Sequence, residues 1–314
     1  MKKKAIIISI KGKTLTKKEK ILLSREKPWG LILFKRNIKS FKQIKSLIKD
    51  VKKLVKDSKF PILIDEEGTA VSRLKGIINH NFEANYFGQL YKLDKKIATT
   101  LYKNYLKSLC YKLKNIGINI NTIPVLDVLR NNTNEIIGKR SFSKNKHIVR
   151  DLGKITVNEC HTNKIVTVIK HIPGHGCSTI DSHQKMPKVD LNMKTLNAID
   201  FYPFKLTYSK LAMTAHILYS KIDSKNVSTF SKKVINEIIR KKIGFKGIIM
   251  SDDISMKALK YDLITNAKKS LLAGCNLVLY CAGNIKDNFK LIKSVPYIDQ
   301  FTAKKTSEIY KILG

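Results

Sequence analysis

Short apolar runs alternate with amphipathic stretches along the whole chain, and this alternation restricts the fold more than any other feature. We expect strands at 5–10, 30–34, 60–64, 118–125, 165–169, 211–215, 247–250 and 276–280. Helical periodicity covers 41–57, 93–115, 146–163, 193–206, 232–242, 266–273 and 303–313. Strands separated by helices form parallel sheets, because each helix returns the chain to the starting edge of the next strand.

Eight strands in 314 residues favour an α/β fold of the closed (β/α)8 TIM-type barrel kind over an open doubly wound sheet. The chain is 43% apolar, which is enough to bury a large core. No linker, low-complexity tract or internal repeat divides it. The sequence therefore predicts a single barrel domain over residues 1–314, of the size usual for a barrel enzyme.

The chain is strongly basic, with 61 Lys and Arg against 24 Asp and Glu and a net charge of +37. Only seven of the basic residues are arginines, although arginine is the preferred side chain for phosphates and base edges. The lysines are spread over the whole chain, and between 41 and 55 they occupy the polar face of an amphipathic helix. We interpret them as solvated faces and expect no specific nucleic-acid partner.

Cysteine usage and hydropathy suggest a reducing, cytoplasmic location. The number of cysteines is odd, and their spacing matches no disulfide or zinc framework, so we expect free thiols. No uncharged apolar stretch reaches the length of a membrane span, and the apolar run after Met1 is too short for a signal peptide. The cysteines are Cys110, Cys160, Cys177, Cys275 and Cys281.

Polar and charged residues follow several of the predicted strands. In a parallel barrel all these strand ends lie on one face, where active sites are built. Any one of these side chains would be explained by a helix cap or a loop hydrogen bond. Several at one face favour a common pocket. They are Asp65, Asp127, Lys170, His171, His216, Ser251, Asp252 and Asp253.

The segment 170–183 has the densest chemistry, with three of the seven histidines in a Gly- and Pro-containing loop. Its histidine spacing does not fit the usual zinc motifs, so we expect no metal. Asp181 lies two residues before His183, an arrangement in which a carboxylate orients an imidazole for general acid/base work. A plain surface-loop histidine is the alternative.

The apolar run before residue 251 ends in two adjacent carboxylates, Asp252 and Asp253. Adjacent side chains on a strand point in opposite directions, so only one can enter the barrel mouth. A lone carboxylate there is a candidate nucleophile for an oxocarbenium-like centre, and the other would cap the next helix.

These segments resemble the family 3 glycoside hydrolases, and more closely the short, single-domain bacterial β-N-acetylglucosaminidases (β-hexosaminidases) of peptidoglycan recycling. The Lys-His-x-Pro-Gly-His-Gly…Asp-Ser-His pattern, followed by Ser-Asp-Asp, is the most specific part. The resemblance covers 30–37, 64–68, 124–128, 137–142, 170–183, 213–216 and 244–256.

The resemblance implies a retaining exo-β-N-acetylglucosaminidase that acts on GlcNAc-anhydro-muramic acid muropeptides, as a monomer and without a cofactor. It implies that Asp252 is the nucleophile and that His183, with Asp181, is the acid/base. Lys170 and Arg140 would lower the pKa of Asp252 if they lay near it. The residues implied to hold the sugar are Asp65, Arg73, Arg140, Lys170 and His171, with His175 close to the same pocket.

The chain departs from the family pattern after the third predicted strand. Relatives usually have Asp-Gln-Glu-Gly-Gly-Arg where this chain has Asp-Glu-Glu-Gly-Thr-Ala at 65–70, so we expect a reshaped loop. Two alternatives stay open. A β-glycoside phosphorylase is one, because a neutral imidazole repels an anionic acceptor less than a carboxylate does. A degenerate, non-catalytic basic barrel that binds glycans or nucleic acid is the other.

Overall fold

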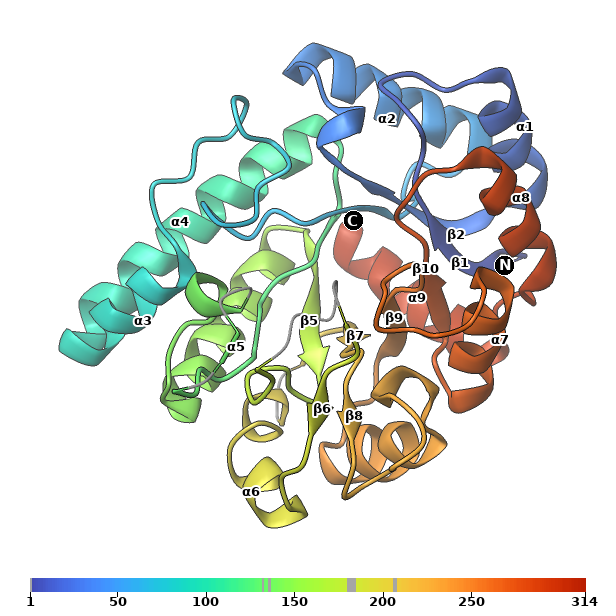
Figure 1. The fold of residues 1–314 in the computed structure, drawn as a ribbon. Helices are drawn as coiled ribbons and strands as arrows, with labels where there is room; N and C mark the ends of the chain where they lie inside the picture. The colour runs from blue at the N-terminus through green and yellow to red at the C-terminus, as the bar shows by residue number, and fades with distance from the viewer. Residues whose placement is uncertain (1, 132, 135–136, 180–184, 206–207) are drawn as a thin grey trace.

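Eight parallel strands close into a barrel in the computed structural model, which describes residues 2–131, 133–134, 137–179, 185–205 and 208–314 (Figure 1). Around the barrel the order is β1-β10-β9-β7-β5-β4-β3-β2. The predicted TIM-type barrel is thus confirmed. The barrel strands are β1 (Lys4–Ile8), β2 (Pro28–Leu33), β3 (Ile62–Ile64), β4 (Ile120–Asn121), β5 (Val166–Ile172), β7 (Leu211–Thr214), β9 (Ile248–Asp253) and β10 (Leu277–Leu279).

Helices surround the barrel, and a two-stranded sheet of β6 (Lys188–Val189) and β8 (Leu218–Tyr219) lies beside it. The α-helices are α1 (Lys17–Glu26), α2 (Phe41–Val55), α3 (Ala84–Leu93), α4 (Lys95–Ile116), α5 (Lys146–Thr162), α6 (Met193–Ala198), α7 (Leu263–Ala273), α8 (Ile285–Ser294) and α9 (Gln300–Leu313). Short 3-10 turns cover Lys35–Asn37, Gly138–Arg140, Tyr202–Phe204 and Ser228–Phe230, and a π-helix covers Val234–Lys242.

The helical predictions need three corrections. Helices α1, α3 and α8 were not expected from the sequence, although Thr16 and Glu19 form a capping box at the start of α1 and Asn284 caps α8. The predicted helix 193–206 is α6 followed by a 3-10 turn with Pro203 in its first turn. The predicted helix 232–242 has π rather than α hydrogen bonding from Val234.

Alternation along the strands decides which side chains reach the inside of the barrel. Ile6, Ile8, Ile249 and Val278 pack outward in the cluster that includes the helices. Their neighbours belong to a second apolar cluster that fills the barrel, as in other barrels of this type. The strand residues of this inner cluster are Ala5, Ile7, Trp29, Ile32, Leu63, Ile120, Val166, Val168, Leu211, Met213, Ile248, Met250, Leu277 and Leu279.

The alternation that points every second side chain into the barrel continues past the apolar core, at the carboxyl ends of the strands. Leu63 is followed two residues later by Asp65, Val168 by Lys170, and Met250 by Asp252. The same alternation that builds the core therefore aims these three charged side chains into the mouth of the barrel.

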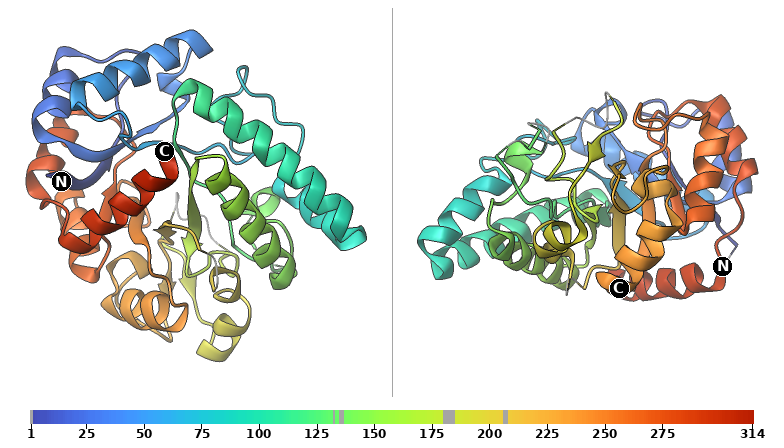
Figure 2. Two further views of the ribbon diagram at one scale, coloured as in Figure 1. Left: turned by 180° about the vertical axis from the view of Figure 1, so that it is seen from behind. Right: turned by 60° about the horizontal axis from the view of Figure 1, so that its bottom comes forward.

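Helix α9 covers the opposite, amino-terminal end of the barrel (Figure 2). Ile309 belongs to the inner apolar cluster, and Tyr310, Ile312 and Leu313 pack against it. Trp29 Nε1 donates to Thr306 Oγ1 at 2.9 Å, which joins β2 to this helix. Within the described ranges, no helix has the length and apolarity that crossing a membrane requires.

Candidate active site

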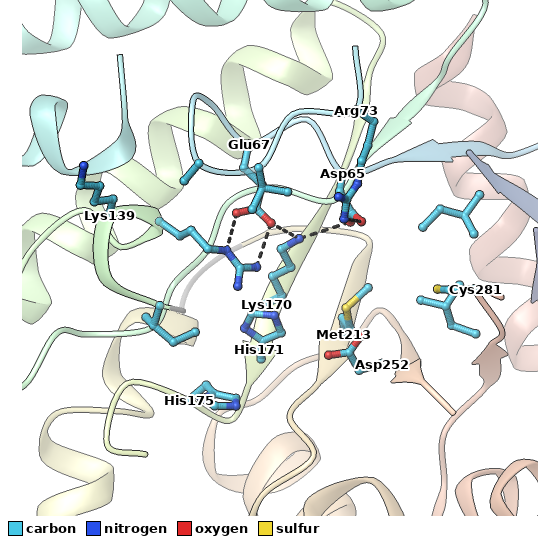
Figure 3. A pocket seen from close by; sticks show the side chains of 16 residues that line it. Asp65, Glu67, Arg73, Lys139, Lys170, His171, His175, Met213, Asp252 and Cys281 are labelled. Atoms are coloured by element: carbon cyan, nitrogen blue, oxygen red, sulfur yellow. Dashed lines mark hydrogen bonds and ion pairs between the residues drawn. The ribbon is translucent and has the colours of Figure 1, made fainter. Parts of the chain in front are cut away.

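A cavity of about 340 Å³ opens at the carboxyl ends of the strands (Figure 3). The structure brings seven of the predicted site residues to this cavity. The other two, Asp181 and His183, lie outside the described residues. The seven are Asp65, Arg73, Arg140, Lys170, His171, His175 and Asp252.

Lys170 lies at the centre of a buried charge network on one wall (Figure 3). Its Nζ is 2.5 Å from Glu67 Oε1, 2.9 Å from Thr122 Oγ1 and 3.5 Å from Asp65 Oδ1. Arg140 contacts the same Glu67 carboxylate with Nε at 2.7 Å and Nη2 at 2.9 Å. Glu67 was not among the expected site residues, although it lies in the segment 64–68 that resembles the family. Lys170 and Arg140 therefore share the Glu67 carboxylate as a partner.

The pKa values of the two carboxyls follow from this network. Burial opposes ionisation of Asp65, but the charges of Lys170 and Arg73 outweigh it and hold its pKa far below the usual range. Burial likewise opposes ionisation of Glu67, yet Arg140 and Lys170 lower its pKa to about 2. Both groups are therefore anionic at neutral pH and engaged with cations.

Asp127 holds both His171 and His175 in place by hydrogen bonds. Its side chain is fully buried, and Oδ2 lies 2.7 Å from His171 Nδ1. Oδ1 accepts the backbone N–H of His175 at 2.6 Å. Although burial opposes it, the charge of His171 lowers the pKa of Asp127. With Nδ1 held by this carboxylate, Nε2 is the His171 nitrogen left for a ligand.

His175 is buried, and burial together with the charge of His171 lowers its pKa to about 4. Its imidazole is therefore neutral at physiological pH. It lines the cavity as an uncharged polar group beside the ion-paired wall.

The adjacent carboxylates of β9 diverge as expected. Asp252 lines the cavity and lies near Met213, below the Lys170 ammonium in the view of Figure 3. Asp253 turns away and accepts from Ser255 N at 3.1 Å and Cys281 N at 3.2 Å. The prediction that it caps the next helix is wrong, because Asp262 is the N-cap of α7.

Three other strand-end residues do not line the cavity, which corrects the expectation that all of them converge there. Ser251 is fully buried, and its Oγ accepts the Leu279 N–H at 3.0 Å. The remaining two support the site. Asp127 is one, as described above. The other is His216, whose Nε2 is 3.0 Å from the backbone oxygen of Asp253 and whose Nδ1 is 2.7 Å from Thr229 Oγ1. His216 therefore braces the end of the strand that presents Asp252.

The loop after β5 is anchored up to Thr179, the last described residue before the predicted dyad. Tyr219 Oη donates to the backbone oxygen of Gly174, and Thr133 Oγ1 donates to that of Gly176 at 2.6 Å. A side chain at Gly176 would place its Cβ 1.9 Å from Val128 O. Only glycine permits this close approach between two loops at the rim.

The loop after β3 carries the departure from the family pattern. Thr69 Oγ1 donates to Glu83 at 3.0 Å, while Ala70 and Val71 contribute to the cavity wall. Arg73, at the end of this loop, contacts Asp65 Oδ2 with Nη2 at 3.0 Å. Across the described part of the chain, no His, Cys, Asp and Glu cluster has the form of a metal site. The same part of the chain has all five cysteines as free thiols.

A closed parallel barrel with paired acids and bases at the carboxyl ends of its strands defines a (β/α)8-barrel enzyme. Residues 3–305 match the family model described as the glycosyl hydrolase family 3 N terminal domain. The chain belongs to this family and is a glycoside hydrolase.

Relatives with the name β-hexosaminidase match nearly the whole chain. The protein from Haemophilus influenzae is 32% identical over 93% of this chain and 85% of its own. The protein from Actinobacillus succinogenes is 31% identical over 94% of this chain and 87% of its own. The crystal structure of NagZ from Neisseria gonorrhoeae in complex with N-trifluoroacetyl-D-glucosamine has a TM-score of 0.88 and 29% identity, and covers 98% of this chain and 90% of its own.

Proposed function

We propose that this glycoside hydrolase removes terminal, non-reducing β-linked GlcNAc from peptidoglycan fragments, with Asp252 as the covalent nucleophile. The observation that carries the proposal is the position of Asp252 at the carboxyl end of β9, where it lines the cavity. Asp65 and Glu67 are engaged with cations on one wall. Asp252 enters the cavity from the end of β9, on another side of the pocket.

The proposed reaction has two displacements. The Asp252 carboxylate attacks the anomeric carbon while His183, oriented by Asp181, protonates the departing glycosidic oxygen. His183 then takes a proton from water, which attacks the same carbon and releases Asp252. Two inversions give net retention.

The charged wall suits the binding of a sugar ring. We infer that Asp65, Lys170, His171 and Arg73 hold its hydroxyl groups, because charge-assisted hydrogen bonds discriminate strongly for such groups. Arg140 is 12% exposed and bidentate on Glu67, so we infer that it contributes mainly by fixing this wall.

Four further features belong to the proposal. The relative crystallised with an N-acylated glucosamine supports an N-acetylated sugar at the nucleophile. The choice of muropeptides as substrate and a monomeric state rest on the resemblance to the peptidoglycan-recycling enzymes, and a cytoplasmic location rests on cysteine usage and hydropathy.

The test is hydrolysis of an aryl β-N-acetylglucosaminide and of GlcNAc-anhydro-muramic acid, each with and without phosphate. Asp252→Asn and His183→Ala should each reduce kcat/KM at least about a thousandfold on the natural glycoside. Asp190→Asn, at a side chain that is 67% exposed, is the control. Mass spectrometry after a slow 2-fluoro analogue should place the label on Asp252.

Full activity of either catalytic variant, or a label on another peptide, would refute the proposed mechanism. Turnover that requires phosphate would identify a phosphorylase instead.

A further inference from the structure

Glu66 lies between the two pocket carboxylates in sequence, but its own side chain is fully buried beneath the loop. Its Oε1 accepts from Ser72 Oγ at 2.5 Å and lies 2.6 Å from His80 Nε2. Its Oε2 accepts the backbone N–H groups of Arg73 at 2.8 Å and Leu74 at 3.0 Å. One carboxylate thus gathers four hydrogen-bonding partners from residues 72–80.

The barrel wall fixes the backbone of Glu66. Its N–H donates to Asn121 Oδ1 at 3.0 Å, and Asn121 Nδ2 donates to its backbone oxygen at 2.9 Å. Asn121 belongs to β4 and is fully buried. The segment 72–74 is therefore tied through Glu66 to a rigid strand.

His80 extends this connection to helix α4. The His80 side chain is 2% exposed, and its Nδ1 lies 2.6 Å from Tyr105 Oη. Burial, with a smaller effect of the Glu66 charge, raises the pKa of Tyr105, so its hydroxyl remains protonated and can serve as donor or acceptor. With Nε2–H donating to the Glu66 carboxylate, His80 Nδ1 can accept the Tyr105 hydroxyl, so both ring nitrogens are satisfied.

Arg73 is the pocket residue that this arrangement controls. Glu66 holds its backbone N–H, while its guanidinium contacts Asp65 and lies over the Phe34 ring, 5.3 Å from the centroid. Glu66 does not belong to the cavity wall that the described residues form. Any effect of Glu66 on a bound sugar must therefore pass through residues it positions.

We propose that Glu66, together with His80, is a positioning residue of the glycosidase that holds Arg73 in the sugar-binding wall. This inference rests on the proposed function. A side chain that could not accept hydrogen bonds would leave two backbone N–H groups of the loop without a partner. The 72–74 segment would then shift, and the Arg73–Asp65 contact would be lost.

The test is a double-mutant cycle with wild type, Glu66→Met, Arg73→Ala and the combined variant, measured on an aryl β-N-acetylglucosaminide. Arg73→Ala should lower kcat/KM by about 10- to 100-fold, the range expected for a charged hydrogen bond. Glu66→Met should lower it about tenfold in wild type and less than about twofold when Arg73 is already alanine.

Two variants separate positioning from general destabilisation. Glu66→Gln keeps an oxygen that can accept from the Arg73 and Leu74 N–H groups. Its kcat/KM should therefore stay within about threefold of the wild-type value. Thr69→Ala, in the same loop but directed at Glu83, should leave it unchanged. If Glu66→Met does not fold, Ser72→Ala and His80→Asn enter the cycle in its place, since each removes one partner of Glu66.

An equal fold-loss from Glu66→Met in both backgrounds, or full activity of Arg73→Ala, would overturn the inference while leaving the proposed function intact. A wild-type enzyme that hydrolyses no β-N-acetylglucosaminide would overturn both, and that outcome is visible before any variant is compared.

Discussion

Replacing Glu67 by glutamine should destabilise the protein in a pH-dependent way. The Glu67 side chain is 6% exposed and pairs with Arg140 and Lys170. These charges outweigh the cost of burial and lower its pKa from 4.5 to about 2 in the folded protein. A difference of this size corresponds to about 3 kcal/mol of stability at neutral pH.

The sign follows from linkage. A carboxyl whose pKa is lowered by folding contributes its full stability above the unfolded pKa of about 4.5, and this contribution is lost as pH falls towards 2. Between pH 7 and pH 4 about 1 kcal/mol of it should disappear. The difference in free energy of unfolding between wild type and Glu67→Gln should shrink by that amount.

The measurement is urea denaturation at both pH values, read from the midpoint and slope by fluorescence and circular dichroism. Glu237→Gln is the control, because this residue is 51% exposed and pairs along its own helix with Lys241. Its effect should stay below about 0.5 kcal/mol at both pH values. A Glu67→Gln variant as stable as wild type at pH 7, or a destabilisation independent of pH, would refute the reasoning.

Two further predictions concern the supports of the site. Asp127→Asn should lower kcat/KM by about 10- to 100-fold, because one of the two oxygens that face His171 Nδ1 and the backbone N–H of His175 becomes an NH2 donor; steady-state kinetics would check this, and an unchanged kcat/KM would contradict it. Gly176→Ala should destabilise the protein by about 1–3 kcal/mol and reduce activity, because its Cβ would meet Val128 O at 1.9 Å. Thermal unfolding of both variants would check this, and Gly12→Ala, where nothing lies within 4 Å, should be neutral.

The barrel and the strand-end location of three site residues could be predicted from local sequence patterns. Apolar runs marked the strands, and the polar residues that follow those runs included Asp65, Lys170 and Asp252. The same signal did not distinguish pocket residues from their supports. His216 also follows a strand, yet it hydrogen-bonds to the end of β9 behind the cavity.

What could not be predicted depends on contacts between distant segments. Glu67 acquires its place from Arg140, 73 residues further along the chain, and Asp127 from His171, 44 residues further along. No spacing rule applies to such pairs. The end of β4 illustrates the same limit. A strand was predicted over 118–125, but β4 covers Ile120–Asn121, and the chain then leaves the strand and leads to Asp127.

The position of α9 has a consequence for the order of events in the proposed reaction. The inner apolar cluster fills the barrel and α9 covers its amino-terminal end, so in the proposed reaction substrate and products would pass through the cavity at the carboxyl ends of the strands. The leaving alcohol and the water molecule that attacks the glycosyl-enzyme would share this opening, so the alcohol would depart before water enters. The released monosaccharide would leave by the same opening that the next substrate enters.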